Sequence, residues 1–276
     1  MNASPRSGVA DYGAIFEQLR ARNLRRSILG VTVVLAMALV VASTDALQVQ
    51  TWFDMPRALV ALVGDALPPD ASRWRQWVRP LGTTLAMSAG GTIISFALSL
   101  PLGVLSARNV APRALSRGCR SLLDVLRSIP CVIWGIGFVA AVGFGSTAGV
   151  LALAAHSTGM LGKFFAEIVE HVDPAPGDVL RSQGVPTLGV LRFAVWPQVV
   201  PRIADVTLYR FEHNLRSATT LGAVGVGGLG QEIVTAFHLF EYREACALIM
   251  VMLALVAVID ALGALIRHRL IEGEAG

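Results

Sequence analysis

Long apolar stretches separated by short polar segments dominate the pattern of this chain. Stretches without a charged residue cover 27–44, 80–107, 128–162 and 245–259. About 20 consecutive apolar residues cross the hydrocarbon core of a bilayer as a helix, so each stretch is long enough, or nearly so, to contain a membrane span. The third stretch is too long for one span, and Gly143-Phe144-Gly145-Ser146 predicts a tight turn within it.

The pattern therefore predicts an all-α, polytopic membrane protein with about six transmembrane helices. Their expected ranges are 27–47, 80–106, 121–144, 147–168, 203–226 and 244–266. Residues 48–79 set apolar side chains such as Trp52 and Phe53 against Asp54 and Arg57, which favours an interfacial helix plus linker over a separate domain. Pro130 lies inside the third range, where we expect a plain kink.

These spans divide the chain into four parts. They are a cytoplasmic N-terminal segment (1–26), a first span with its outer amphipathic segment (27–79), a transmembrane domain (80–270) and a cytoplasmic tail (271–276). A polar loop over 169–201 interrupts the transmembrane domain. The apolar run from Ile28 is longer than the hydrophobic region of a usual signal peptide, which favours an uncleaved first span.

Composition and charge agree with this membrane class. Of 276 residues, 54% are hydrophobic and 15% charged, well away from the soluble average. The net charge of +4 indicates membrane topology rather than nucleic-acid binding, because the basic residues gather beside the spans. Six spans counted from the basic N-terminal segment place both termini and the loop 169–201 in the cytoplasm. The outer segment 45–79 departs from this rule, since it carries Arg57, Arg73, Arg75 and Arg79.

The first half of the polar loop has the pattern of a short helix with a clean end. Pro174 suits the first turn of a helix, and Asp173 before it is a candidate cap. Gly184, followed by a proline two positions later, predicts the end of this helix. Three side chains lie near one face of it: Val179, Leu180 and Gln183.

The second half of the loop predicts another short helix, from Thr187 to about Trp196, with a stop at Pro197. Two short helices joined by a glycine turn make a protrusion that fits a groove on a partner protein. The alternative is a surface loop with no partner.

The expected fifth span is unusually polar between Tyr209 and Thr219. A charged residue at the centre of a lipid-facing helix costs about 2.5–3.5 kcal/mol on insertion scales, so these side chains must face the bundle interior, a subunit interface or water. One interpretation places four side chains beside a translocated oxyanion: Arg210, Asn214, Arg216 and Ser217. In the other, Glu212 and Arg216 form an intramembrane ion pair that holds a dimer, because they are four positions apart.

Patterns typical of enzymes are weak in this sequence. Residues 222–230 contain a G-x-G-x-x-G match, but no strand precedes it, so we expect close helix packing instead of dinucleotide binding. The single lysine, Lys163, follows no phosphate-binding loop, and the five histidines lack metal-ligand spacing. We expect no catalytic residue, no metal site and no cofactor bound by this chain.

The polar loop resembles the "EAA" loop of ABC importer permeases. Asp178, Gly184 and Pro197 stand at the spacing of that pattern, although Asp178 replaces a glutamate, Val179 and Leu180 replace two alanines, and Trp196 replaces a leucine. In the family this loop is a cytoplasmic coupling helix that docks into a groove of the ATPase subunit. The resemblance implies a set of ATPase-coupling residues: Asp178, Val179, Leu180, Gln183, Gly184 and Pro197.

A wider resemblance covers residues 81–270, which look like the phosphonate-type branch of binding-protein-dependent ABC permeases. The matching segments are 126–130, 138–143, 159–167, 193–198, 208–212, 216–219 and 225–230. This resemblance implies the architecture of a type I ABC importer permease, placed in the bacterial inner membrane.

The same resemblance implies the partners and the substrate class. It implies a homodimer of this permease, two cytoplasmic ATPase subunits that use the ATP and magnesium, and an extracytoplasmic solute-binding protein. The implied substrates are phosphonates, phosphite or phosphate, moved by alternating access. Two alternatives stay open, namely a permease of the same architecture for methionine or another small solute, and a membrane-embedded enzyme.

Overall fold

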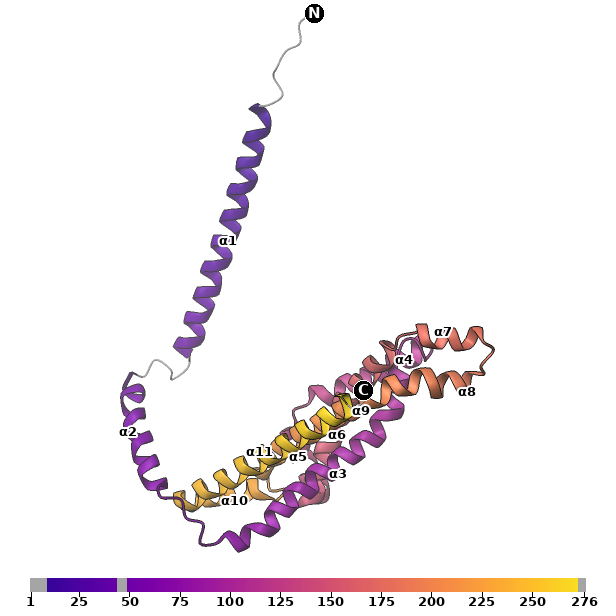
Figure 1. The fold of residues 1–276 in the computed structure, drawn as a ribbon. Coiled ribbons are helices and arrows are strands. Elements are labelled where there is room, and N and C mark those ends of the chain that lie inside the picture. The colour runs from indigo at the N-terminus through magenta and orange to yellow at the C-terminus, as the bar shows by residue number, and fades with distance from the viewer. Residues whose placement is uncertain (1–8, 44–48, 273–276) are drawn as a thin grey trace, which may run out of the picture. The chain divides into compact units, whose positions relative to one another are not determined.

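The computed structural model describes residues 9–43 and 49–272 of the chain, and within these ranges all regular structure is helical. The chain forms two units, one up to Gly64 and one from Asp65 onward (Figure 1). The first unit contains α1 (Val9–Ser43) and most of α2 (Val49–Ala66). The expected all-α class is confirmed. Residues 44–47 of the expected first span, 1–8 of the N-terminal segment and 273–276 of the tail lie outside the described residues.

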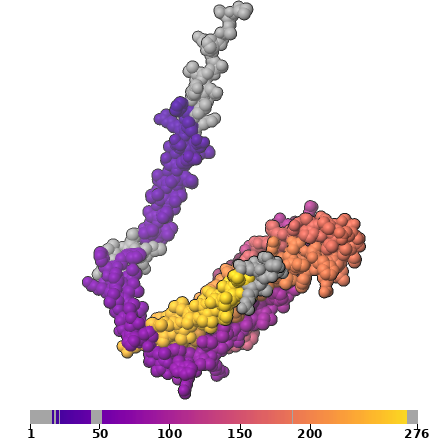
Figure 2. All heavy atoms as spheres, in the orientation of Figure 1, coloured from indigo at the N-terminus to yellow at the C-terminus, as the bar shows by residue number. Residues whose placement is uncertain are grey.

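Four long helices build the second unit. They are α3 (Trp74–Ser106), α6 (Ser146–Glu170), α9 (Trp196–Gly222) and α11 (Tyr242–Glu272). The shorter α7 (Ala175–Ser182) and α8 (Thr187–Val190) lie at one end of this bundle, and α10 (Leu229–His238) lies toward the other end (Figure 1). In the space-filling view, residues around 175–195 form the salmon-coloured end of the second unit (Figure 2).

The α3–α6 pair forms the centre of the bundle, and small residues bring the two helices together. A Cβ added at Gly91 would lie 2.6 Å from the Leu153 side chain, and one at Gly103 would lie 2.6 Å from Phe165. The serine and threonine side chains of α3 on this face are buried: Thr84, Ser88, Thr92, Ser95 and Ser99. In a bilayer, small residues allow such close approach and so supply the packing that holds helices together.

The expected count of six membrane spans stays a prediction, because fewer described helices are apolar enough to qualify on their own. By length and composition, three described segments qualify, namely Arg22–Ser43, Trp74–Ser106 and Tyr242–His268. The bent pair of α4 (Arg113–Ser128) and α5 (Cys131–Val142) makes a fourth if it is one span. The helices α6 and α9 have 25 and 27 residues, which is enough to cross a hydrocarbon core. Both carry more polar residues than a lipid-facing helix, because much of their surface is covered by neighbouring helices.

The expected third span, 121–144, is not one helix. The chain forms α4 (Arg113–Ser128) and α5 (Cys131–Val142), which meet at an angle of 88°. Ile129 precedes Pro130 and has an extended backbone (φ −83°, ψ 120°), as the residue before a proline prefers. The plain kink expected at Pro130 is therefore wrong, and the position is a sharp corner between a basic amphipathic helix and an apolar one.

The turn expected at Gly143–Ser146 is confirmed. α5 ends at Val142 and α6 starts at Ser146, and Gly143 and Gly145 between them have φ of +88° and +132°. Such angles favour glycine because it has no Cβ. The Gly145 N–H donates to the carbonyl of Gly225, which ties this turn to the segment after α9.

The stop expected at Pro197 is wrong, since α9 starts at Trp196 and continues through Pro197 to Gly222. A π-helical segment, Leu191–Val195, joins α8 to α9. A proline in the first turn of a helix removes no internal hydrogen bond, because that N–H has no partner there in any case. The π-helical segment lies directly before α9, so the chain stays helical from α8 into α9.

Candidate functional site

The polar loop folds into a short helical hairpin, which we call the coupling hairpin and define as residues 173–198. Its first arm is α7, and its tip is Gly184, with φ of +77°. The Val185 N–H donates to Leu180 O at 3.1 Å, and the Gly184 N–H donates to Arg181 O at 3.0 Å. These two bonds make a Schellman motif, which satisfies the last carbonyls of α7. The helix end expected at Gly184 is therefore confirmed.

Side-chain hydrogen bonds hold the base of the coupling hairpin. Gln198 accepts from the Asp173 N–H at 3.0 Å and donates to Ala194 O at 2.7 Å. The Asp173 carboxylate accepts from the Ala175 N–H at 3.0 Å, but the N-cap of α7 is Pro174, so the cap expected at Asp173 is wrong by one position. Between the arms, Gly177 is buried and lies close to Val190, so the two arms pack tightly.

The outer surface of the coupling hairpin carries both apolar and charged side chains. Val179 is 56% exposed and Leu188 is 79% exposed, where exposed means not covered by this chain. Phe193 and Trp196, nearer the base, are also exposed. The expected coupling residues Asp178 and Gln183 are exposed as well, and Leu180 is half-buried. Exposed apolar side chains grouped on a polar protrusion are typical of a protein–protein contact.

Ionic contacts tie the end of α6, where the polar loop begins, to α4. Glu170 accepts from the Arg120 guanidinium at 2.5 Å and from the Arg108 N–H at 2.6 Å. Burial acts to raise the pKa of Glu170, but these two donors together hold it below its usual value. Glu170 therefore stays ionised at neutral pH and keeps α4 beside the start of the polar loop.

A chain of buried polar side chains crosses the bundle at half height. The Arg210 Nε donates to Ser157 Oγ at 2.9 Å, and Ser157 Oγ donates to Asn214 Oδ1 at 2.7 Å. Asn214 Nδ2 in turn donates to Thr92 Oγ1 at 2.9 Å. This polar chain, defined as Thr92, Ser157, Arg210 and Asn214, joins α3, α6 and α9. Arg210 and Asn214 are 2% and 0% exposed, so they lie in the bundle interior, one of the three environments expected for them.

The expected Glu212–Arg216 ion pair is wrong within the subunit. Glu212 pairs with Arg267 at 2.8 Å, and Arg216 pairs with Asp260 at 3.1 Å. Both partners lie on α11, which runs beside α9. Gly263 lies between them on α11, and a Cβ at Gly263 would collide with the Glu212 carboxylate. The absence of a side chain at Gly263 lets Glu212 reach Arg267. Ion pairs between α9 and α11 therefore replace the Glu212–Arg216 pair expected within one helix.

The remaining expected path residues lie away from the polar chain. Arg216 and Asp260 are 43% and 44% exposed at the side-chain level, and Ser217 is half-buried. In a bilayer a half-exposed ion pair must face water or another protein, because lipid tails cannot solvate it. The structure thus separates the four expected path residues into a buried pair and a more exposed pair.

Sequence reasoning missed the partners of these residues: Thr92, Ser157, Asp260, Gly263 and Arg267. Asp260 had one available signal, since it ends the charge-free stretch 245–259 inside an expected span. Thr92 and Ser157 had none, because small hydroxyl residues are common in membrane helices and bond to their own helix.

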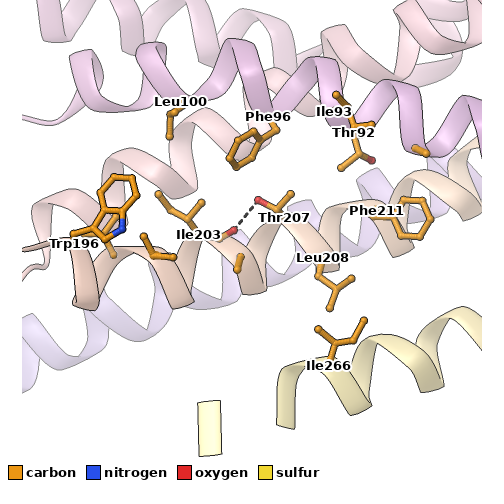
Figure 3. Close-up of a pocket in the computed structure, with 14 residues that line it drawn as sticks. Thr92, Ile93, Phe96, Leu100, Trp196, Ile203, Thr207, Leu208, Phe211 and Ile266 are labelled. Carbon is orange, nitrogen blue, oxygen red and sulfur yellow. Dashed lines mark hydrogen bonds between the residues drawn. The ribbon is translucent and has the colours of Figure 1, made fainter. Parts of the chain in front are cut away.

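An apolar groove of about 570 Å³ lies between α3, α9 and α11 (Figure 3). Ile93 and Phe96 from α3 face Ile203 and Leu208 from α9, and Ile266 from α11 closes one side. Nearly all of its lining is hydrocarbon, so the groove suits acyl chains or another helix and not an oxyanion.

Within the described residues, no three His, Cys, Asp or Glu side chains gather where they could hold a metal ion. The absence of a metal site stays an expectation for the whole chain.

Comparison with known proteins decides the family. Residues 99–272 match the family of binding-protein-dependent transport system inner membrane components. The chain belongs to this family. It is therefore the permease subunit of an ABC importer and a membrane protein, as the sequence predicts.

Two of the curated relatives are permeases for phosphorus oxyanions. The chain is 49% identical over 211 residues to the phosphite transport system permease protein PtxC of Stutzerimonas stutzeri, covering 76% of this chain and 77% of the relative. It is 40% identical over 189 residues to the phosphate-import permease protein PhnE of Mycolicibacterium smegmatis, covering 68% of this chain and 36% of that protein.

Solved ABC importers share the fold. The permease of the MetNI methionine ABC transporter in an inward-facing conformation matches with a TM-score of 0.63 and 21% identity, over 73% of this chain and 99% of that one. A bacterial importer of the acidic polysaccharide alginate matches with a TM-score of 0.62 and 14% identity, over 90% of this chain and 99% of that one. At these identities the likeness confirms the type I permease architecture and says nothing of substrate.

Loss of one partner of the Glu212–Arg267 pair is expected to destabilise this permease. Glu212 is 5% exposed, so Glu212→Gln leaves the Arg267 charge without its counter-ion in a low-dielectric bundle. Breaking a fully buried pair costs about 3–5 kcal/mol, and we expect about 2 kcal/mol here because Arg267 is partly exposed. The measurement is the melting temperature of the detergent-solubilised protein.

A double variant tests the pairing itself. Glu212→Gln with Arg267→Gln should recover part of the loss, whereas losses that simply add would show that the two side chains do not interact. Arg216→Gln serves as the control, since its ion pair with Asp260 is half-exposed and should contribute little.

Proposed function

We propose that this permease imports a phosphorus oxyanion, namely phosphite, a phosphonate or phosphate, driven by ATP hydrolysis in partner subunits. The observation that carries the proposal is the 49% identity to a phosphite permease across about three quarters of both chains. The inferred role of the chain is to provide a path through the bilayer by alternating access, with no catalytic residue, cofactor or metal of its own.

The coupling hairpin is the proposed contact with the motor. It stands at one end of the second unit, its arms are packed together, and its outer surface carries exposed apolar side chains among charged ones. A rigid protrusion of this kind can transmit movement from a partner, because its two arms keep their relative positions when force acts on them. We assign two cytoplasmic ATPase subunits as that partner, which places the coupling hairpin and both termini in the cytoplasm of a bacterium.

A second copy of this chain is the proposed partner within the membrane. The half-exposed Arg216–Asp260 pair on α9 and α11 supports this arrangement, since it needs water or protein beside it. We place the translocation path along this face, between two permeases, with Arg216 and Ser217 lining it. An extracytoplasmic solute-binding protein would deliver the oxyanion to the outer end of the path, and no nucleic acid is involved.

The test is uptake by the reconstituted importer. Proteoliposomes containing the permease, its ATPase and its solute-binding protein are expected to accumulate radiolabelled phosphite, phosphate or methylphosphonate only when ATP is supplied to the ATPase. Uptake of methionine in place of these anions would assign the chain to the alternative substrate class. Turnover of a substrate by the permease without its ATPase would favour an enzyme.

A further inference from the structure

We infer that Arg210 and the start of α5 form a binding site for a tetrahedral oxyanion inside each permease subunit. The inference rests on the oxyanion import proposed above and assigns the place where the anion is held in transit. It adds a site within one subunit to the path assigned between subunits.

The guanidinium of Arg210 is a buried charge without a counter-ion. Its Nε donates to Ser157, while its Nη2 is buried and has no hydrogen-bond partner. In the described part of the chain no carboxylate forms an ion pair with it, and Glu212 on the same helix is already paired with Arg267. An isolated buried charge costs several kcal/mol in a low-dielectric interior. An anion that enters the bundle would therefore be attracted to Nη2.

A helix N-terminus lies beside this guanidinium. α5 begins at Cys131, directly after the corner at Pro130, and no side chain caps its first N–H groups. Ser157 accepts from Arg210, and the neighbouring His156 lies 3.1 Å from the carbonyl of Ile129, two positions before Cys131, so the guanidinium lies near the start of α5. The free N–H groups and the helix dipole make such an N-terminus attractive to anions. Two independent sources of positive potential thus meet at one place.

The topology explains why these groups meet. Cys131 lies twelve positions before Gly143, and Ser157 lies twelve positions after Gly145, on the two helices that the glycine turn joins. The start of α5 and Ser157 are therefore at the same depth, since both helices rise about 1.5 Å per residue. Arg210, which bonds to Ser157, lies near the middle of the 27-residue α9. Secondary transporters, a different class of transport protein, place substrate sites at this depth, with the N-termini of broken helices toward anionic groups.

A histidine completes the complementarity to a protonated phosphorus oxyanion. His156 Nδ1 lies 3.1 Å from the Ile129 carbonyl, which can only accept, so the hydrogen is on Nδ1 and Nε2 is an acceptor in the neutral ring. His156 directly precedes Ser157, which accepts from the Arg210 Nε. Monoanionic phosphite or phosphate offers both P–O⁻ acceptors for Arg210 and a P–OH donor for a ring nitrogen. Chloride offers no donor, so the site favours the oxyanion.

The first test is uptake by the complete importer in proteoliposomes. We expect Arg210→Gln to lower the initial rate of phosphite uptake at least tenfold, and Arg210→Lys, which keeps the charge, to lower it less. The matched control is Arg79→Gln, because Arg79 is an exposed arginine near the start of α3; its uptake should stay within twofold of wild type.

The second test measures binding without transport. The permease–ATPase complex, without the solute-binding protein, should melt at a higher temperature in sodium phosphite than in sodium chloride of equal ionic strength. Arg210→Gln should abolish this difference and Arg79→Gln should keep it. Any phosphite bound by the ATPase contributes equally to all variants and cancels. If Arg210→Gln does not fold, Arg210→Lys replaces it, and its phosphite shift should be smaller than that of wild type.

The outcomes separate the two proposals. Wild-type proteoliposomes that take up none of phosphite, phosphate and methylphosphonate would reject the proposed function. If wild type transports phosphite while the Arg210 variants match it in uptake and in phosphite-dependent melting, the import stands and the site is rejected. Equal stabilisation by chloride and phosphite would also overturn the site. It would mean that the positive charge attracts any anion and does not recognise the oxyanion.

Discussion

Gly184→Trp is expected to abolish ATP-driven uptake while the permease still inserts into the membrane. A Cβ at Gly184 meets no atom within 4 Å, so the indole would project from the tip of the coupling hairpin without a clash inside the fold. The φ of +77° adds a local strain of about 1–2 kcal/mol for an ordinary side chain. A bulky tip cannot enter a groove shaped for glycine. Uptake in proteoliposomes, with membrane content checked by immunoblot, measures the effect.

The matched control for this variant is Gly184→Asn. Asparagine tolerates the left-handed conformation and its side chain is small, so the Schellman turn should form and most of the uptake should remain. Co-purification of the ATPase supplies a second readout, which should be lost with tryptophan and kept with asparagine. If Gly184→Trp keeps both wild-type uptake and the bound ATPase, the tip does not dock and the coupling role is refuted.

Gly230→Ala is expected to prevent the second unit from folding correctly. A methyl group at Gly230 would collide with the carbonyl of Thr219 in α9, and one at Gly222 would collide with the backbone of Gly230 and Gln231. Because these contacts are backbone to backbone, no side-chain rotation relieves them. Overpacking typically costs about 1–3 kcal/mol, and we expect at least the upper end here. The measurement is the yield of monodisperse protein in fluorescence-detected size-exclusion chromatography.

Gly82→Ala provides the comparison. Gly82 lies inside α3 and an added Cβ meets nothing within 4 Å, so alanine should be neutral or stabilise the helix by up to about 1 kcal/mol. A normal yield for Gly230→Ala would mean that α9 and α10 do not cross as closely as the structure places them.

The coupling hairpin shows which local features are readable from sequence. The turn at Gly184 depends on residues within a few positions, so its pattern predicts it correctly. Pro197 misleads, because its effect depends on whether the preceding turn is α or π. The π segment Leu191–Val195 places Pro197 in the first turn of α9, and no pattern in the sequence predicts this segment.

The corner between α4 and α5 illustrates the same limit. Pro130 marks a disturbance, but a proline inside an apolar stretch is compatible with a kink or with a break. The 88° bend between α4 and α5 follows from the different environments that suit the two helices. α4 carries four arginines and cannot share the apolar environment of α5, so the two separate at the proline.

Hydropathy and short motifs thus determine the all-helical class, the presence of membrane helices, the glycine turns and the family. Each rests on local chemistry: burial of apolar surface, backbone angles open to glycine, and fixed spacing. The ion pairs Glu212–Arg267 and Arg216–Asp260 and the polar chain from Arg210 to Thr92 required the tertiary structure. A charged residue in a membrane helix must find a partner, but which of several distant residues it finds depends on how the helices pack.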